Sequence, residues 1–162
     1  IGDTKGRLGQ SIYLREIDGR EEGMPPHVDL TIERRNGDCV RSLIEAGDVT
    51  ACHDLSDGGL LVAVAEMAMA STGASAIGAE IADLSGDVPL HAWAYGEDQA
   101  RYLVTTTDAA KIIAACEAAD VPVAELGTTG GATLSIAGET IAVAELKEAH
   151  ESWLPNYMAA AE

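Results

Sequence analysis

Apolar and polar positions follow two different periods along the chain, which predicts helices and short strands in one domain. Apolar residues recur three and four positions apart over 32–44, and this spacing predicts a helix that begins after Asp29 and ends at Gly47. Gly37 weakens the middle of this helix and is expected to bend or interrupt it. The run 57–72 is apolar on almost every side, which predicts a central helix packed on more than one face.

The remaining pattern predicts further helices and several short strands. The helices are expected at 90–95, from Asp108 to Cys116 and over 146–153, where Pro155 should break or kink the last one. The strands are expected at 49–55, which should be buried, and at 74–81, 102–106, 121–123, 133–136 and 140–143. Pro122 places 121–123 at a sheet edge, and Ala137-Gly138-Glu139 predicts a hairpin. The fold class predicted is therefore α/β, with a mixed sheet.

Residues 1–27 form a glycine-rich lead-in around one apolar patch at 12–14, and they predict loops with one short element. No internal repeat or low-complexity tract divides the rest, which predicts one domain over 1–162. Because the chain opens on Ile1 rather than Met, we expect it to be a piece of a longer polypeptide.

The composition favours an acidic domain built on small aliphatic side chains. The 162 residues are 47% hydrophobic but only 4% aromatic and contain no Phe, which suits close packing of helices on a sheet. Acidic residues outnumber basic ones by 27 to 10, and a net charge of −17 argues against nucleic acid or an anionic membrane as partner. The sequence has neither a run of roughly 20 apolar residues nor a signal peptide, so we expect a cytoplasmic protein.

The three cysteines, Cys39, Cys52 and Cys116, lie far apart in apolar surroundings and are expected to be buried thiols of a reducing compartment. No pair of them has the short spacing of a zinc site, and the four histidines do not cluster either. The sequence therefore predicts no metal site built from Cys or His.

The stretch Cys52-His53-Asp54-Leu55-Ser56-Asp57-Gly58-Gly59-Leu60 joins a predicted strand to the apolar helix. Two glycines at the start of a helix let backbone N–H groups approach a ligand, and the helix dipole favours phosphate there. The alternative is a tight turn in which Ser56 or Asp57 is simply the N-cap. Residue types alone leave both interpretations open.

Two other groups of residues suggest binding. Gly6-Arg7-Leu8-Gly9-Gln10-Ser11 has the composition of an anion-binding loop, although a glycine-rich connection is the commoner use of such a stretch. Glu97, Asp98 and Arg101 follow the predicted helix at 90–95 and offer contacts to a ligand or a partner domain. Charged loop residues usually stay in water, so solvated turn charges are the favoured interpretation.

Three segments together resemble a known family: His53-Asp54-Leu55-Ser56-Asp57-Gly58-Gly59-Leu60, Gly6-Arg7-Leu8-Gly9-Gln10-Ser11-Ile12-Tyr13-Leu14-Arg15-Glu16 and Val28-Asp29-Leu30. In order and along essentially the whole chain, the sequence resembles the carboxy-terminal domain of the synthetase subunit of phosphoribosylformylglycinamidine synthase. Motifs related to the first segment also occur in aminoimidazole ribonucleotide synthetase, thiamine-monophosphate kinase and selenophosphate synthetase. The second segment favours the formylglycinamidine enzyme over these relatives.

This resemblance implies an ATP-dependent ligase of purine biosynthesis that uses magnesium. The full enzyme would convert formylglycinamide ribonucleotide to formylglycinamidine ribonucleotide, activating the amide oxygen by phosphoryl transfer before ammonia displaces it. The ammonia would come from glutamine through a glutaminase subunit, with a small accessory subunit in the complex. The implied fold is a three-layer α/β/α sandwich, like the carboxy-terminal domain of aminoimidazole ribonucleotide synthetase, paired with a preceding ATP-binding domain of the same chain.

Only part of the family's machinery transfers to these residues. The family's catalytic histidine and main magnesium carboxylates belong to segments with no counterpart in this sequence, so no catalytic or metal-binding residue is assigned and the piece alone is expected to be inactive. Asp54, Ser56, Asp57, Gly58 and Gly59 are the expected phosphate- or nucleotide-binding positions. Two alternatives remain: a non-catalytic structural or phosphate-binding half of a pseudo-symmetric enzyme, and a domain of a related kinase such as thiamine-monophosphate kinase.

Overall fold

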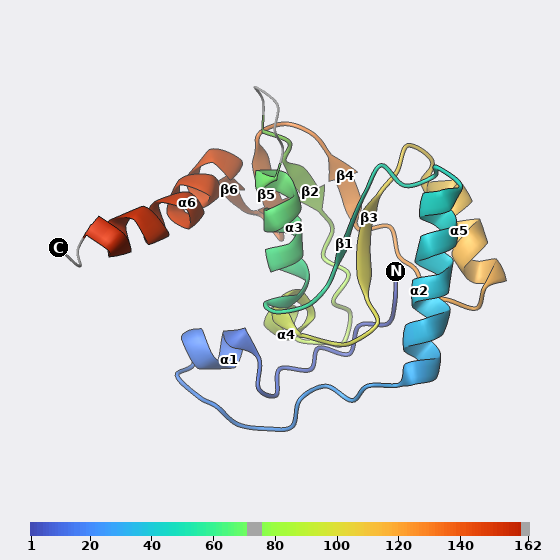
Figure 1. The fold of residues 1–162 in the computed structure, drawn as a ribbon, viewed down its shortest axis with the longest axis horizontal. Helices are drawn as coiled ribbons and strands as arrows, with labels where there is room; N and C mark the ends of the chain where they lie inside the picture. The colour runs from blue at the N-terminus through green and yellow to red at the C-terminus, as the bar shows by residue number, and fades with distance from the viewer. Residues whose placement is uncertain (71–75, 160–162) are drawn as a thin grey trace. The chain divides into compact units, whose positions relative to one another are not determined.

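The computed structural model describes residues 1–70 and 76–159, and the chain divides into two compact units. The first unit comprises Ile1–Ala63 and Leu84–Glu125, and the second comprises Val64–Asp83 and Leu126–Glu162. Each unit contains both helices and strands, which are coloured along the chain in Figure 1. The predicted α/β class is confirmed. The ends of the predicted helix at 71–72 and of the predicted strand at 74–75 lie outside the described residues.

The first unit holds most of the helices and a two-stranded antiparallel ribbon. Its elements are α1 (Ile12–Glu16), α2 (Leu30–Glu45), β1 (Ala51–Asp54), the start of α3 (Gly59–Met69), α4 (Leu90–Tyr95), β3 (Tyr102–Thr105) and α5 (Ala109–Ala118). β1 and β3 pair with each other, in a register that runs from Ala51 opposite Thr105 to Asp54 opposite Tyr102. The register places the end of β1 beside the beginning of β3, and the candidate site follows from this placement.

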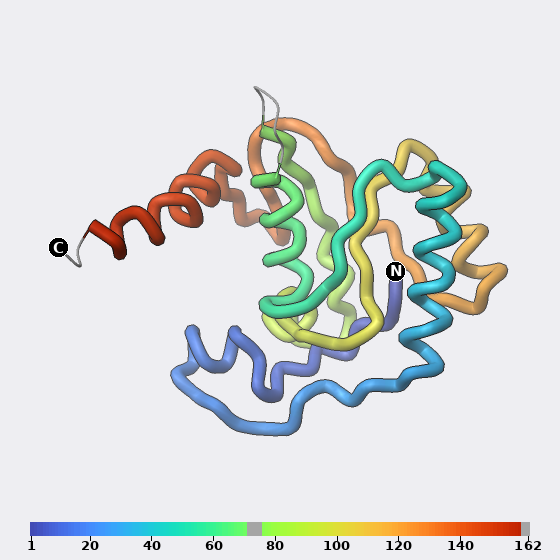
Figure 2. The backbone as a smooth tube through the Cα atoms, viewed as in Figure 1, coloured from blue at the N-terminus to red at the C-terminus, as the bar shows by residue number. Residues whose placement is uncertain are grey.

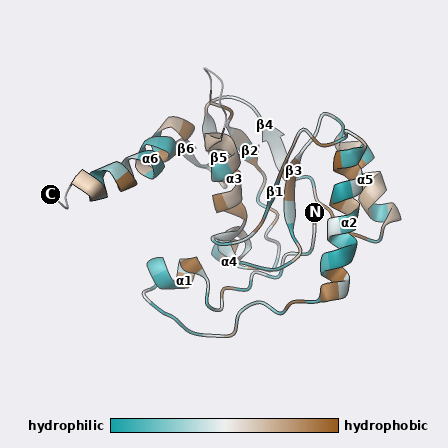
Figure 3. Cartoon of the chain, viewed as in Figure 1, coloured by the Kyte–Doolittle hydropathy of each residue, from teal (hydrophilic) through white to brown (hydrophobic). Residues whose placement is uncertain are grey.

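Helix α2 begins and ends where the sequence predicts. The Asp29 side chain accepts hydrogen bonds from the N–H groups of Thr31 and Ile32, as an N-cap does. At the other end the Gly47 N–H donates to the Ile44 carbonyl and the Asp48 N–H to the Leu43 carbonyl, with Gly47 at a φ of +74°. Figure 3 shows the helix carrying both hydrophilic and hydrophobic segments.

The expected interruption at Gly37 is wrong, because α2 is continuous from Leu30 to Glu45. One glycine inside a helix costs only about 1 kcal/mol. Two satisfied ends and a buried apolar face outweigh that cost. The glycine also leaves room for a neighbour, since a Cβ at this position would lie 3.3 Å from the Tyr102 hydroxyl.

The core of the first unit lies between α2 and α5, which run side by side in Figure 1. Its buried members are Cys39 and Leu43 from α2, Ile112 and Cys116 from α5, and Val121. The N-cap predicted at Asp108 is confirmed, because its carboxylate accepts the Lys111 N–H.

The prediction that 49–55 forms a buried strand is wrong in its burial. β1 exposes Ala51, Cys52 and Asp54, because the helices rather than this ribbon supply the core of the unit. The expectation of three buried cysteines therefore holds for Cys39 and Cys116 and fails for Cys52.

These thiols should differ sharply in reactivity towards a thiol reagent at pH 8. Burial and a hydrogen bond with Cys39 together raise the pKa of Cys116 to about 11, so its reactive thiolate is scarce at that pH. We expect Cys52 to react in the native protein, and Cys39 and Cys116 to react only on unfolding. Mass spectrometry of the labelled protein measures this, with Cys52→Ser as the control that removes the fast phase. Labelling of Cys116 at the rate of Cys52 would contradict the placement of the thiols.

The second unit contains a four-stranded mixed sheet in the order β4-β2-β5-β6. Its strands are β2 (Ala79–Ile81), β4 (Gly127–Thr129), β5 (Thr133–Ile136) and β6 (Glu139–Ala142). β2 runs parallel to β5 and antiparallel to β4, which confirms the mixed sheet. The predicted hairpin is also confirmed. β5 and β6 pair antiparallel and are connected by Ala137 and Gly138, which both have a positive φ.

The edge strand predicted at 121–123 is wrong, because this segment forms no strand in the described structure and β4 at Gly127–Thr129 takes the edge position. The carbonyl of Pro122 instead accepts the Gly2 N–H within the first unit. A proline has no N–H to donate to a sheet, but its carbonyl can still accept a hydrogen bond, and this one holds the start of the lead-in at Gly2.

Helix α6 (Val143–Ala159) completes the second unit. The expected break at Pro155 is wrong, because the helix continues through it. Trp153 and Tyr157 stack on each other with ring centroids 5.4 Å apart and are mostly exposed. None of the helices within 1–70 and 76–159 combines the length and the apolar composition needed to cross a bilayer.

Candidate functional site

The predicted binding residues form a turn between β1 and α3, which we call the glycine turn (Asp54–Gly59). The turn reverses the chain through Gly58 and Gly59, whose φ values of +77° and +68° lie in the region that favours glycine. Leu55 anchors it, since its side chain is buried and its N–H donates to the Arg101 carbonyl over 3.0 Å. The structure thus brings the five predicted residues together. It exposes the side chains of Asp54, Ser56 and Asp57 and buries the two glycines.

The N–H groups of both glycines already have acceptors within the chain. The Gly58 N–H donates to Glu97 Oε1 over 2.9 Å, and the Gly59 N–H donates to the Ser56 carbonyl over 3.1 Å. Within the described part of the chain, neither the Ser56 nor the Asp57 side chain accepts a hydrogen bond from an N–H group in the first turn of α3. The N-cap role suggested for Ser56 or Asp57 is therefore wrong, and a carboxylate from another part of the chain accepts the N–H of the residue that precedes α3.

A run of close backbone contacts explains the glycines better than ligand binding does. A Cβ on Gly59 would lie 2.6 Å from the Gly96 carbonyl oxygen. A Cβ on Gly96 would lie 2.9 Å from Gly6 Cα. These three glycines, which we call the glycine contact, let the turn, the end of α4 and the lead-in approach at backbone distance. Figure 2 shows the lead-in in blue passing beside the chain that follows α4.

Asp98 binds the backbone of the lead-in. Its Oδ2 accepts the N–H groups of Lys5 and Gly6, each over 2.8 Å, and the residue is only 4% exposed. Arg7 lies beside it, with Nε 3.9 Å from Asp98 Oδ1. At the start of the glycine-rich segment 6–11, the Gly6 N–H and the preceding Lys5 N–H therefore do bind an anion, but that anion is the chain's own carboxylate.

Arg101 is buried and binds both the residues that follow α4 and the lead-in. Its guanidinium donates to the carbonyls of Gly96 and Asp98 and to Thr4 Oγ1, and the residue is 3% exposed. Burial lowers the pKa of Arg101, and the nearby Asp98 carboxylate opposes this effect. The prediction of solvated turn charges is wrong for Asp98 and Arg101, because both are buried and bonded. We call Glu97, Asp98 and Arg101 the clip.

Asn36 is a further structural residue that the sequence reading missed. It is fully buried on α2, and its Nδ2 donates to the carbonyl of Ala100 over 2.9 Å. Ala100 has a φ of +58°, so this bond supports a residue in a conformation that alanine rarely adopts. Its position in the sequence could have indicated its burial, since Asn36 lies four residues after Ile32 and four before Val40 on the apolar face of the helix.

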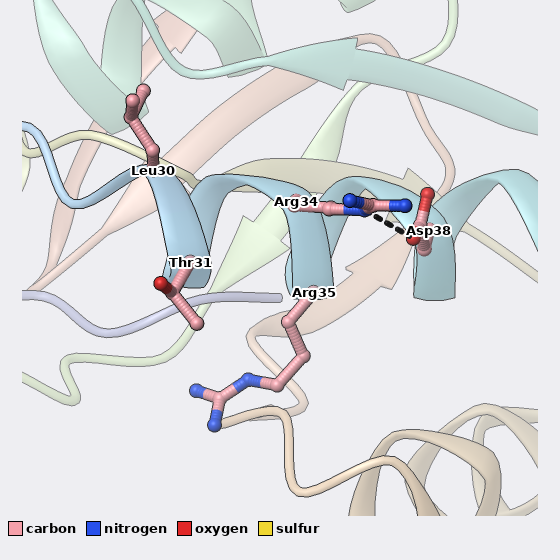
Figure 4. Close-up of a pocket in the computed structure, with 5 residues that line it drawn as sticks. All are labelled: Leu30, Thr31, Arg34, Arg35 and Asp38. Carbon is pink, nitrogen blue, oxygen red and sulfur yellow. Dashed lines mark ion pairs between the residues drawn. The ribbon is translucent and has the colours of Figure 1, made fainter.

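One hollow lies elsewhere in the first unit, along the first half of α2. It measures about 470 Å³, and Figure 4 shows Arg34, Arg35 and Asp38 among the side chains that line it. Arg34 pairs with Asp38 and Arg35 pairs with Asp120, so neither arginine offers an uncompensated charge to an anion. Within the described segments, no three side chains of His, Cys, Asp or Glu are grouped as a metal site would require.

Comparison of the sequence with known proteins gives a consistent result. Residues 1–138 match the family model described as "AIR synthase related protein, C-terminal domain". Phosphoribosylformylglycinamidine synthase subunit PurL from a Bradyrhizobium species is 56% identical over 164 residues, and the alignment covers 99% of this chain. The same subunit from Parvibaculum lavamentivorans is 57% identical over 165 residues with the same coverage. The chain spans 22% of the length of each of these relatives.

Solved structures show the same fold at much lower sequence identity. "T. maritima PurL complexed with ATP" is 16% identical, with a TM-score of 0.67 over 90% of this chain and 24% of that one. A structure of phosphoribosylformylglycinamidine synthase II from Thermotoga maritima gives the same TM-score and coverage at 18% identity. Because the family model covers most of the sequence, the chain belongs to the family of the AIR synthase related protein C-terminal domain.

Proposed function

We propose that this chain is the carboxy-terminal domain of a phosphoribosylformylglycinamidine synthase subunit, an ATP-dependent ligase of purine biosynthesis. The observation that carries the proposal is the 56% identity to such a subunit over 99% of this chain. The whole enzyme would form formylglycinamidine ribonucleotide from formylglycinamide ribonucleotide and ammonia. The domain alone is inactive under this proposal, because the clip and the glycine turn offer neither a nucleophile nor a general base aimed into a pocket.

The partners follow from the same proposal. One solved relative carries ATP, another is described as complexed with FGAR, and a third as PurLQS, an assembly of more than one subunit. We propose that this domain works with a preceding ATP-binding domain of its own chain, a glutaminase subunit and a small accessory subunit, in the cytoplasm. The chain as a whole, 1–162, would then act as one carboxy-terminal domain.

Within that enzyme, we propose that the exposed face of the glycine turn contacts a phosphate of the substrate or the nucleotide. Ser56 offers a hydroxyl donor at the start of α3, where the helix dipole favours an anion. The N–H groups of Gly58 and Gly59 hold the turn in place, because they donate to Glu97 and to the Ser56 carbonyl. A turn that is already closed on itself meets a phosphate without first being ordered, which lowers the entropic cost of binding.

The described carboxylates of this chain do not form a complete magnesium site by themselves. Asp54 and Asp57 are exposed carboxylates, and no third His, Cys, Asp or Glu joins them among the described residues. Magnesium needs six ligands in near-octahedral geometry, usually including substrate phosphates. Any magnesium used with ATP is accordingly assigned to the rest of the enzyme.

The test is the Ser56→Ala variant of the full-length enzyme, assayed with its partner subunits. Loss of a hydrogen bond to a charged phosphate is expected to raise KM for ATP or for formylglycinamide ribonucleotide by about 10-fold. Thr107→Ala is the matched control, since it removes an exposed hydroxyl shortly before α5 of the same unit, and should leave both KM values unchanged. Unchanged KM values in Ser56→Ala would remove the turn from substrate binding.

A structural role is the second candidate, and the occupied glycine amides favour it. If the domain only braces an active site built elsewhere, Ser56→Ala, Asp54→Ala and Asp57→Ala will all leave both KM values as in the wild type. Calorimetry with ATP separates the two candidates further. ATP binding by the full-length enzyme that weakens in Ser56→Ala would count against a purely structural domain.

A further inference from the structure

One oxygen of Glu97 joins two parts of the chain that lie far apart in sequence. Glu97 Oε1 accepts the Gly58 N–H from the glycine turn and the Ile12 N–H from the lead-in, each over 2.9 Å. The two donors lie 39 and 85 residues away from it along the chain. The Glu97 N–H in turn donates to the Arg7 carbonyl over 3.0 Å, which ties it to the lead-in a second time.

Both N–H groups belong to helix starts. Ile12 is the first residue of α1, and Gly58 directly precedes the first residue of α3. The first N–H groups of a helix have no acceptor inside the helix, so each needs one from elsewhere. One carboxylate oxygen supplies both, and it thereby fixes the start of α3 relative to the start of α1.

The glycine turn is consequently held at both ends by one segment. Before Ser56, the Leu55 N–H donates to the Arg101 carbonyl. After Asp57, the Gly58 N–H donates to Glu97. The two residues between these bonds, Ser56 and Asp57, project their side chains into solvent from a backbone that is held on both sides.

We propose that Glu97 is a positioning residue, which sets the glycine turn for phosphate through hydrogen bonds to backbone N–H groups and without touching the ligand. This inference rests on the proposed function of the turn. It also gives the lead-in a role in substrate binding, because the same oxygen holds Ile12. The requirement at position 97 is for an acceptor oxygen of the right reach and not for a negative charge, since no cation is recorded at this carboxylate among the described residues.

The experiment compares Glu97→Ala and Glu97→Gln in the full-length enzyme with its partner subunits. Glutamine keeps an amide oxygen where Oε1 lies, whereas alanine removes it. Glu21→Ala is the matched control, because Glu21 is an exposed glutamate of the lead-in. Two quantities are measured: amide hydrogen exchange of peptides covering 4–14 and 55–61 without substrate, and KM and kcat with each of the two phosphate-bearing substrates.

In Glu97→Ala we expect exchange to speed up about 10-fold or more in both peptides together, because both donors lose the same acceptor. KM for one phosphate-bearing substrate should rise about 10-fold with kcat within about threefold of wild type, as for a loss of binding geometry. Glu97→Gln should restore the exchange and the KM, and Glu21→Ala should match the wild type.

Three results would overturn the positioning role: unchanged exchange in either peptide of Glu97→Ala, KM values that stay at wild type while both peptides loosen, or a Glu97→Gln enzyme that behaves like Glu97→Ala. The glutamine variant keeps the test decisive if the alanine variant fails to fold. Failure of the proposed function looks different. A wild-type enzyme that binds neither substrate would refute that function before any variant is made, and the exchange of the two peptides would still report whether Glu97 couples them.

Discussion

Replacement of Gly59 by alanine is expected to lower the free energy of unfolding by about 3 kcal/mol. Two effects add. The residue has a φ of +68°, where a Cβ is strained, and that Cβ would lie 2.6 Å from the Gly96 oxygen and 2.8 Å from the Tyr95 carbonyl carbon. Both neighbours are backbone atoms, so they cannot move aside as a flexible side chain would. Separation of the α4 end from the glycine turn is the expected consequence.

Gly47→Ala separates the two effects. Gly47 has a φ of +74°, close to that of Gly59, but nothing lies within 4 Å of the Cβ it would carry. This control is expected to cost only about 1 kcal/mol, from backbone strain alone. Urea unfolding in a Trp153→Phe background measures both, because the buried Trp93 is then the single tryptophan. Equal losses in the two variants would mean that the glycine contact is not close-packed.

Removal of the Asp98 carboxylate is expected to be at least as damaging. Asp98→Ala leaves the N–H groups of Lys5 and Gly6 without their acceptor and leaves Arg101 buried without a nearby opposite charge. Leaving two N–H groups without an acceptor and a buried guanidinium without the nearby opposite charge is expected to cost about 3 kcal/mol or more. We expect the lead-in to detach and the urea midpoint to fall accordingly.

Asp3→Ala is the control for this second variant. Asp3 pairs with Lys5 at 3.3 Å, but both side chains are more than half exposed, so the pair contributes little. The urea midpoint of Asp3→Ala should match that of the parent. Limited proteolysis adds a direct readout, because Asp98→Ala should become sensitive to cleavage within 1–12 and Asp3→Ala should not. A protease-resistant lead-in in Asp98→Ala would show that the carboxylate does not hold it.

Residue type and spacing predicted the features that depend on neighbouring residues, such as helix caps and the hairpin turn. Asp29 and Asp108 cap the helices that follow them, and Gly138 closes the hairpin between β5 and β6. In each case the partners lie within a few residues, so residue type and spacing carry the information. Pro155 shows the limit of such rules, since a helix can continue through a proline when its neighbouring turns remain intact.

The binding role of the glycine turn stays a prediction, and the sequence did not indicate the hydrogen bonds that hold the turn. The glycines at 6 and 58 lie in segments for which anion binding is one of two interpretations of the sequence, and in the structure their N–H groups donate to carboxylates of the same chain. The anions are Asp98 and Glu97, which lie 92 and 39 residues away from them. No periodicity links residues so far apart, and a charged pair in a loop usually stays in water. Asp98 is buried and Glu97 half-buried where Gly96 at the end of α4 lies against Gly6.

The separation between Asp98 and its donors also has a consequence during synthesis. Lys5 and Gly6 leave the ribosome before Asp98 does, and the carboxylate that holds them lies 93 and 92 residues further along the chain. At ordinary translation rates that delay is on the order of 10 s. For that interval the N–H groups of Lys5 and Gly6 lack this acceptor, and bringing them to it closes a long loop at an entropic cost. The amino-terminal segment of this chain is thus among the last to reach its native place.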